Sequence, residues 1–166
     1  METPKHEMNH CKRNTILFLG SQTISLFGSA LVQYAILWYM TLNTQSGVMM
    51  TISIICGFVP TFFLSPFAGV WADRYNRKIL IILSDSLIAI STLVLAILFL
   101  MGYEALWLLF LMSAIRAIGT GIQGPAVGAI LPQMVPEDKL TKVNGTNGSI
   151  QALIMLVAPM VSAALL

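Results

Sequence analysis

Charged residues are scarce in this sequence and unevenly placed. Only 10% of the 166 residues are Asp, Glu, Lys or Arg, whereas 57% are hydrophobic and the mean hydropathy is +0.82. Between Asn14 and Ala72 there is no charged side chain and no histidine. Soluble domains typically have about a quarter of their residues charged, so this composition excludes an ordinary soluble fold. The uncharged stretch can cross a bilayer twice, because one crossing takes roughly 20 apolar residues.

Several chemical functions lack the residues that they need. The two cysteines, Cys11 and Cys56, lie in a polar leader and in an apolar run, which argues against a disulfide and against a metal site. No glycine-rich phosphate loop ending in Gly-Lys-Ser/Thr occurs. Both histidines are in the leader, where no pair of carboxylates converges with them. We expect a protein that is not an enzyme, uses no metal or other cofactor and has no nucleic-acid partner.

Apolar runs separated by short polar links predict an all-α integral membrane protein. A polar leader, residues 1–13, precedes one bundle, residues 14–166. The five expected membrane-spanning helices cover residues of about 15–40, 47–72, 79–101, 106–131 and 149–166. The polar segment 132–148 contains two Asn-Gly pairs, which favour turns. We expect its middle to form a short helix at the membrane surface.

Lysine and arginine indicate the orientation of these helices, because short cytoplasmic loops hold them in excess. The leader has three, the loop after the second span has three and the loop after the fourth has two, whereas the other two links have none. The sequence therefore predicts a cytoplasmic N-terminus. The fifth span then ends on the far side of the membrane, inside an apolar run, and we expect an incomplete bundle.

The strongest motif is the charged link after the second span, Gly69-Val-Trp-Ala-Asp73-Arg74-Tyr-Asn-Arg77-Lys78. It resembles the signature of the major facilitator superfamily, with Asn76 where that family usually has glycine. The resemblance implies a latch that holds one access state through a network of charges. It also implies the first three-helix repeat of that fold plus two helices of the second, with a C-terminal half missing. The alternative is that the cations only enforce topology.

Arg116 lies about ten residues into the fourth span, where an ionisable group is costly and is usually functional. Thr120 and Gln123 share its helical face, so the stripe should face the interior of the bundle. Arg116-Ala-Ile-Gly119 also resembles the family's signature in this helix, which implies a role in proton coupling. A purely structural Arg116, bonded to a backbone carbonyl, is the alternative.

Other polar side chains inside the spans are further candidates. Gln22 and Gln33 fall on one face of the first span together with Ser29, and they are expected to line a substrate cavity or to bond a neighbouring helix. Asp85 lies about two turns into the third span. We expect it to pair with the cationic link and to belong to the latch, although it could instead titrate by itself.

Small residues and prolines suggest where helices approach closely. Gly124 and Gly128 fit a small-xxx-small packing pattern in the fourth span. Ala158-Pro159 in the fifth span resembles a weakened form of the Gly-Pro element of exporters in the superfamily, so we expect Pro159 to bend and pack this helix.

The segments Gln123-Gly-Pro125-Ala and Pro136-Glu-Asp-Lys-Leu140 are similar to the branch of the superfamily that includes bacterial macrolide exporters. That resemblance implies proton-coupled efflux of a small hydrophobic drug by alternating access, in the bacterial cytoplasmic (inner) membrane. The expected partners are the lipid bilayer, the drug, protons and the missing C-terminal half. A metabolite symporter of the same fold is one alternative, and a fragment that does not transport or a half-transporter that needs a partner is another.

Overall fold

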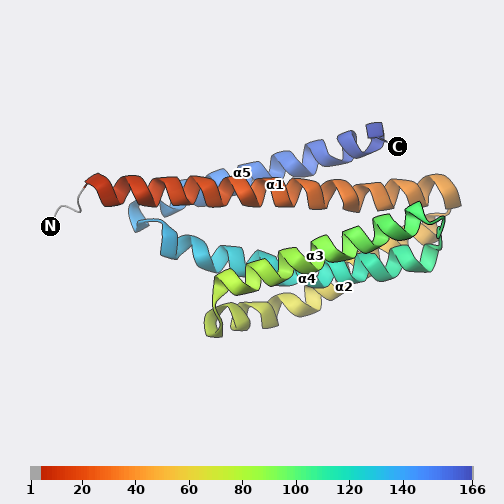
Figure 1. Ribbon diagram of the computed structural model, residues 1–166, viewed down its shortest axis with the longest axis horizontal. Coiled ribbons are helices and arrows are strands. Elements are labelled where there is room, and N and C mark those ends of the chain that lie inside the picture. Colours follow the sequence, from red (N-terminus) through yellow and green to blue (C-terminus); the bar gives the residue numbers. More distant parts are fainter. Residues whose placement is uncertain (1–4, 166) are drawn as a thin grey trace.

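The computed structural model describes residues 5–165, and over that range the chain forms five α-helices joined by short links (Figure 1). The helices are α1 (Lys5–Thr44), α2 (Gly47–Arg74), α3 (Arg77–Leu100), α4 (Leu106–Met134) and α5 (Glu137–Leu165). All five are long and apolar enough to cross a membrane. The predicted all-α membrane fold with five spans is confirmed.

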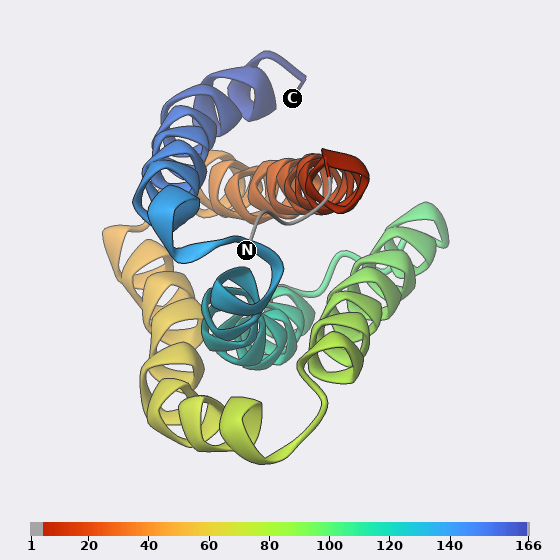
Figure 2. The same ribbon diagram turned by 90° about the vertical axis from the view of Figure 1, so that its left-hand side faces the viewer.

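Helix α4 occupies the centre of the bundle (Figure 2). Helices α2 and α3 pack on two sides of α4, and α5 packs mainly against α1. Half of the most apolar window of α4 is buried, compared with 6% for α2. The polar side chains of α4 are therefore enclosed by other helices, which is where a membrane protein can accommodate them.

Short links join consecutive helices, although α2 and α3 meet mainly near their link because α4 packs between them. The link between α1 and α2 turns at Gln45, whose φ of 49° lies in the left-handed region that few side chains other than Asn and Asp adopt readily. Between α2 and α3, the Asn76 side chain caps α3 by accepting a hydrogen bond from the Lys78 backbone N–H at 3.1 Å. After α3, Gly102 takes a φ of 79°, which glycine adopts without steric cost.

The outer surface of the bundle is apolar. Four phenylalanines of α2 are each 62–65% exposed, namely Phe58, Phe62, Phe63 and Phe67. Apolar patches of this extent are rare on soluble monomers, whereas lipid tails solvate them well. The exposed aromatic face therefore agrees with a bilayer around the helices.

Two separate apolar clusters form the buried core, one towards each end of the bundle. The first joins α1, α3 and α4 through Ile36, Met40, Leu95, Leu108, Leu109 and Met112. The second joins α3 and α4 near the α2–α3 link through Ile81, Ala126, Val127 and Ile130. On α3 and α4, the stretch between these clusters carries the buried polar groups.

The helix limits differ most from the sequence expectation at the starts of α1 and α5. Helix α1 already begins at Lys5, so the described part of the polar leader is helical. Helix α5 begins at Glu137 rather than near residue 149, and it includes both Asn-Gly pairs that were expected to form turns. Pro136 precedes α5, and two acidic residues in its first turn suit the positive end of the helix dipole.

Candidate transport site

Arg116 projects from the centre of α4 and is 2% exposed. Its Nη2 donates to the backbone oxygen of Ser29 at 2.8 Å and to the Ser29 hydroxyl at 3.0 Å, both on α1. Its Nη1 donates to the Thr92 hydroxyl on α3. No carboxylate forms an ion pair with Arg116 among residues 5–165, and its Nε there has no hydrogen-bond partner. The guanidinium thus joins three helices while its charge stays uncompensated.

A second polar group lies on the same three helices. Asp85 of α3 accepts two hydrogen bonds at Oδ1, from Gln123 Nε2 of α4 at 2.6 Å and from Ser25 Oγ of α1 at 3.2 Å. Gln123 Nε2 also lies 3.3 Å from Gln22 Oε1, on α1. Gln22 and Gln123 are both buried, so their amides are committed to this cluster.

This position corrects the expectation that Asp85 pairs with the cationic link. No ion pair between Asp85 and Arg74, Arg77 or Lys78 is found in the described chain. Neutral donors on α1 and α4 lie directly against the carboxylate and satisfy it within the bundle. Lys78 lies seven residues before Asp85 on α3, which separates the two residues by about 10.5 Å along the helix axis.

The two polar groups form the rungs of a ladder across α1, α3 and α4. We call them the Arg116 rung and the Asp85 rung. Seven residues, or nearly two turns, separate the rungs on every helix. The paired positions are Gln22 and Ser29 on α1, Asp85 and Thr92 on α3, and Gln123 and Arg116 on α4. Because the spacing is the same on all three helices, a single alignment of α1, α3 and α4 along the bundle axis allows both rungs to form.

Gly119 lies between the rungs and lets α3 approach α4. A Cβ atom at this position would lie 2.6 Å from Ile88 Cγ1 and 3.1 Å from the backbone oxygen of Ser84. Gly121 likewise faces α2, where a Cβ would lie 3.1 Å from Thr61 Cα. Neither glycine was among those predicted to allow close packing.

Gly124 and Gly128, which were expected to allow close packing, do not do so in this part of the chain, and neither does Gly69 of the charged link. A Cβ atom at Gly69, Gly124 or Gly128 would meet no atom within 4 Å, and the last two are exposed. The small-xxx-small spacing was present, but it lies on a face of α4 that no described helix covers. Pro159 lies within α5 and is half-buried, next to the buried Ala158.

Two cavities flank the ladder. The α1–α2–α4 cavity, of about 520 Å³, is lined by Gln33, Thr120 and Gln123 together with Arg116. The α1–α3 cavity, of about 430 Å³, is lined by Asp85 and Thr92 and again by Arg116. Of the four residues predicted to line a substrate cavity, three therefore share one cavity. The fourth, Gln22, contacts Gln123 instead.

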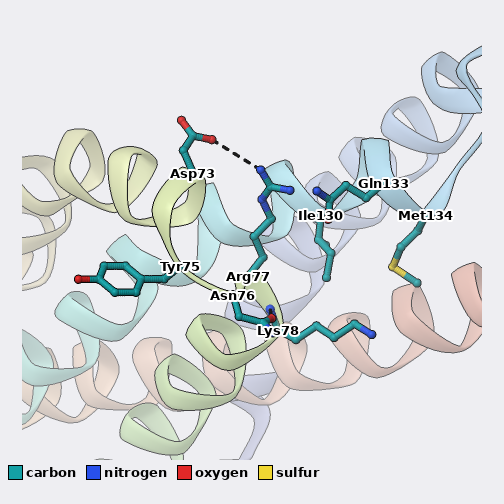
Figure 3. Close-up of a pocket in the computed structure, with 8 residues that line it drawn as sticks. All are labelled: Asp73, Tyr75, Asn76, Arg77, Lys78, Ile130, Gln133 and Met134. Carbon is teal, nitrogen blue, oxygen red and sulfur yellow. Dashed lines mark hydrogen bonds and ion pairs between the residues drawn. The ribbon is translucent and has the colours of Figure 1, made fainter.

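The charged link joins α2 to α3 and lies beside the end of α4 (Figure 3). Arg77 Nη2 is 3.7 Å from Asp73 Oδ1, and Arg77 Nε donates to the backbone oxygen of Ala72 at 2.9 Å. The Asp73 side chain is 78% exposed, so water weakens this ion pair. Arg74 and Lys78 are exposed as well. The link borders a pocket of about 550 Å³ whose other wall is the end of α4.

The ladder also contains three hydroxyl side chains that were not predicted to be functional, those of Ser25, Ser29 and Thr92. Their hydroxyls bond the two ionisable groups, Asp85 and Arg116. A signal was present, because Ser29 shares a helical face with Gln22, and Thr92 shares one with Asp85. Serine and threonine are common in membrane helices, so the sequence alone does not distinguish the few that bind a buried charge.

The comparisons with known proteins agree on one family. The sequence profile of the Major Facilitator Superfamily matches residues 18–166. Macrolide efflux protein A of Streptococcus pyogenes is 35% identical over 95% of this chain, and the protein of the same name from Enterococcus faecalis is 36% identical over 72%. The Staphyloferrin A transporter of Staphylococcus aureus is 28% identical over 76%. No solved structure matches the chain.

The chain spans 39% of the length of the Streptococcus pyogenes relative and 37% of the Enterococcus faecalis relative. The matched profile covers α2 to α5 almost entirely and most of α1, including both rungs of the ladder and the charged link. Five apolar helices and a profile match over most of the sequence lead to one assignment. The chain is a multi-pass membrane protein that belongs to the Major Facilitator Superfamily of transporters.

Proposed function

We propose that this chain is part of a secondary active exporter that moves hydrophobic drugs such as macrolides out of the bacterial cell. The observation that carries the proposal is the 35% identity to Macrolide efflux protein A over 95% of the chain. The region of similarity extends over nearly the whole chain. Inward proton flow across the cytoplasmic membrane supplies the energy.

The α1–α2–α4 cavity is the proposed substrate path. Its lining is largely apolar, with amides and a hydroxyl at Gln33, Gln123 and Thr120. Such a lining suits a large hydrophobic molecule that carries a few hydroxyl and carbonyl groups. Arg116 reaches both this cavity and the α1–α3 cavity, which supports a part in coupling rather than in packing alone.

The link between α2 and α3 is the proposed latch, and it lies on the cytoplasmic side. The positive-inside distribution of lysine and arginine supports this orientation. The loose and exposed pair of Asp73 and Arg77 can break at little cost, as a contact that changes between access states must. Gly69 and Arg74 complete the motif, and Lys78 faces the adjoining pocket.

Transport requires further helices, because substrates of such carriers bind between two bundles. The length of the chain relative to its curated relatives supports this requirement. A half-transporter that joins a separate partner is the second candidate. We expect the 166-residue chain alone, reconstituted in vesicles, to show no drug uptake, and uptake by that chain would contradict this part of the proposal.

The test is drug accumulation in a susceptible bacterium that expresses the complete reading frame containing this chain. We expect lower accumulation of a radiolabelled macrolide, which a protonophore restores to the level of cells without the protein. Depletion of ATP at a maintained proton gradient should have no effect. Equal accumulation with and without expression would refute macrolide export, and proton-driven uptake of a metabolite would support a symporter.

A further inference from the structure

The α1–α2–α4 cavity has a positive charge in its wall and no negative one. Among the described residues that line it, Arg116 is the single charged side chain. Asp85 lines the other cavity and belongs to the other rung, about 10.5 Å away along the helix axis. Charged side chains inside a membrane usually pair with a group of opposite charge or with backbone carbonyls. Within this cavity, the described chain provides no counter-charge for Arg116.

The hydrogen bonds of Arg116 leave part of its guanidinium group available. A guanidinium group has five N–H donors. Both N–H groups of Nη2 point to Ser29, and Nη1 donates one to Thr92. Within residues 5–165, the Nε–H and the second N–H of Nη1 have no acceptor. Nε is closed off from water, so an arriving acceptor must turn the side chain slightly toward the cavity.

Two neutral donors in the same cavity are also unused. Ser53 of α2 is 1% exposed, and its hydroxyl has no hydrogen-bond partner in the described part of the chain. The Gln33 amide of α1 likewise forms no hydrogen bond with the described residues. Both side chains line the cavity together with Arg116. A carboxylate only accepts hydrogen bonds, so it matches this set of donors.

We propose that the α1–α2–α4 cavity binds hydrophobic carboxylic acids in their ionised form, with the ligand carboxylate on Arg116. The inference rests on the proposed role of this cavity as the substrate path. It adds a class of anionic substrates to the hydrophobic drugs proposed above.

The cavity provides for both parts of such a molecule. Arginine and a carboxylate form two parallel charge-assisted hydrogen bonds, which are stronger than neutral ones. The apolar part of the ligand can pack against Leu37, Ile54 and Phe58. The volume of about 520 Å³ is in the range of sites for drug-sized ligands.

The charge of this ligand also agrees with export. The membrane potential of a bacterium is negative inside, and it acts on every charge that crosses the bilayer. It favours the outward movement of an anion as well as the inward movement of a proton. Exchange of the two is therefore driven in the direction that the proposed function requires.

Photolabelling of the complete protein in lipid nanodiscs tests the site without transport. The probe is an alkyl carboxylic acid that carries a benzophenone, and its methyl ester is the neutral control. Mass spectrometry identifies the labelled peptides, which we expect to come from the cavity wall, including the segment of α2 with Ile54 and Phe58. Arg116→Met should raise the half-saturating concentration of the acid about tenfold or more and leave that of the ester unchanged.

Arg13→Met makes the same chemical change at an exposed position of α1 and should not alter labelling by the acid. Equal half-saturation of the acid in wild type and Arg116→Met would overturn the proposal. So would an effect of Arg116→Met that is equally large for the ester.

A second pair of variants retains Arg116. Thr120 lines the same cavity one helical turn after Arg116. Thr120→Glu places a carboxylate within reach of the guanidinium, whereas Thr120→Gln adds a side chain of the same length without the charge. We expect Thr120→Glu to weaken labelling by the acid about tenfold relative to Thr120→Gln. Equal labelling of these two variants would overturn the role of the uncompensated charge.

These measurements separate the inference from the export proposal. If the acid does not label the cavity while macrolide accumulation still falls on expression, the inference fails and the export proposal stands. If the acid binds at Arg116 while macrolide accumulation is unchanged, macrolide export is refuted and the anion site stands.

Discussion

Replacing Gly119 by alanine tests the close approach of α3 and α4 on which the ladder depends. The added Cβ would lie 2.6 Å from Ile88 Cγ1 and 3.1 Å from both Ile88 Cδ1 and the backbone oxygen of Ser84. The first distance is too short for any side chain, and the backbone oxygen cannot turn aside. The two helices must therefore separate, or Ile88 must leave its rotamer.

The matched control is Gly124→Ala on the same helix. A Cβ there meets no atom within 4 Å. Both substitutions gain the same helix propensity, about 0.5–1 kcal/mol, so their difference in unfolding free energy isolates the overpacking. That difference should be about 1–3 kcal/mol, or roughly a fivefold to 150-fold change in the equilibrium constant.

The assay is reversible unfolding of the chain in mixed micelles, followed by far-ultraviolet circular dichroism. We expect Gly119→Ala to unfold at a lower denaturant fraction than Gly124→Ala. Adding Ile88→Ala to Gly119→Ala should recover part of the loss, because it makes room for the new methyl group. Equal stability of the two glycine variants would refute the packing of α3 on α4 described above.

Three further predictions concern the charges and the orientation. Arg116→Met should leave the chain at least as stable to unfolding, because it removes a buried charge that has no ion-pair partner. The same substitution should abolish drug export by the complete protein. Marked destabilisation of the chain would instead indicate that Arg116 has a structural role. Tyr39→Phe removes an exposed hydrogen bond to Glu104, of 3.0 Å, and should cost less than about 1 kcal/mol by the same unfolding assay. Finally, in intact cells and a background without native cysteines, an impermeant thiol reagent should label Ser46→Cys but not Lys142→Cys, and the reverse pattern would invert the proposed orientation.

The membrane spans were predictable because they depend on composition and length, which need no knowledge of tertiary contacts. The charged link between α2 and α3 was predictable for a related reason, since Asp73 and Arg77 are only four residues apart in the sequence. Helical periodicity also put Arg116 and Gln123 on one face of α4, and both are buried. Each of these features is local in the sequence.

The partners of those side chains could not be predicted, because they depend on which helices pack together and on how these helices are aligned along the bundle axis. Asp85 was assigned to cations close to it in sequence, but its donors come from residues 25 and 123. The glycines raise the same difficulty. Gly124 and Gly128 have the spacing of a packing motif, while Gly119 makes the tight contact, and only the direction of each helical face distinguishes them.

The equal spacing of the two rungs limits the changes in length that this bundle can accept. Deleting one residue between Arg116 and Gln123 turns the rest of α4 by about 100° and shortens it by about 1.5 Å. If Arg116 keeps its partners on α1 and α3, Gln123 then loses its own partners on both of these helices. If Gln123 keeps its partners, Arg116 loses both of its own. Substitutions can be absorbed one side chain at a time, but insertions and deletions in the intervals 22–29, 85–92 and 116–123 cannot. Homologues that vary in length are therefore expected to do so outside these intervals.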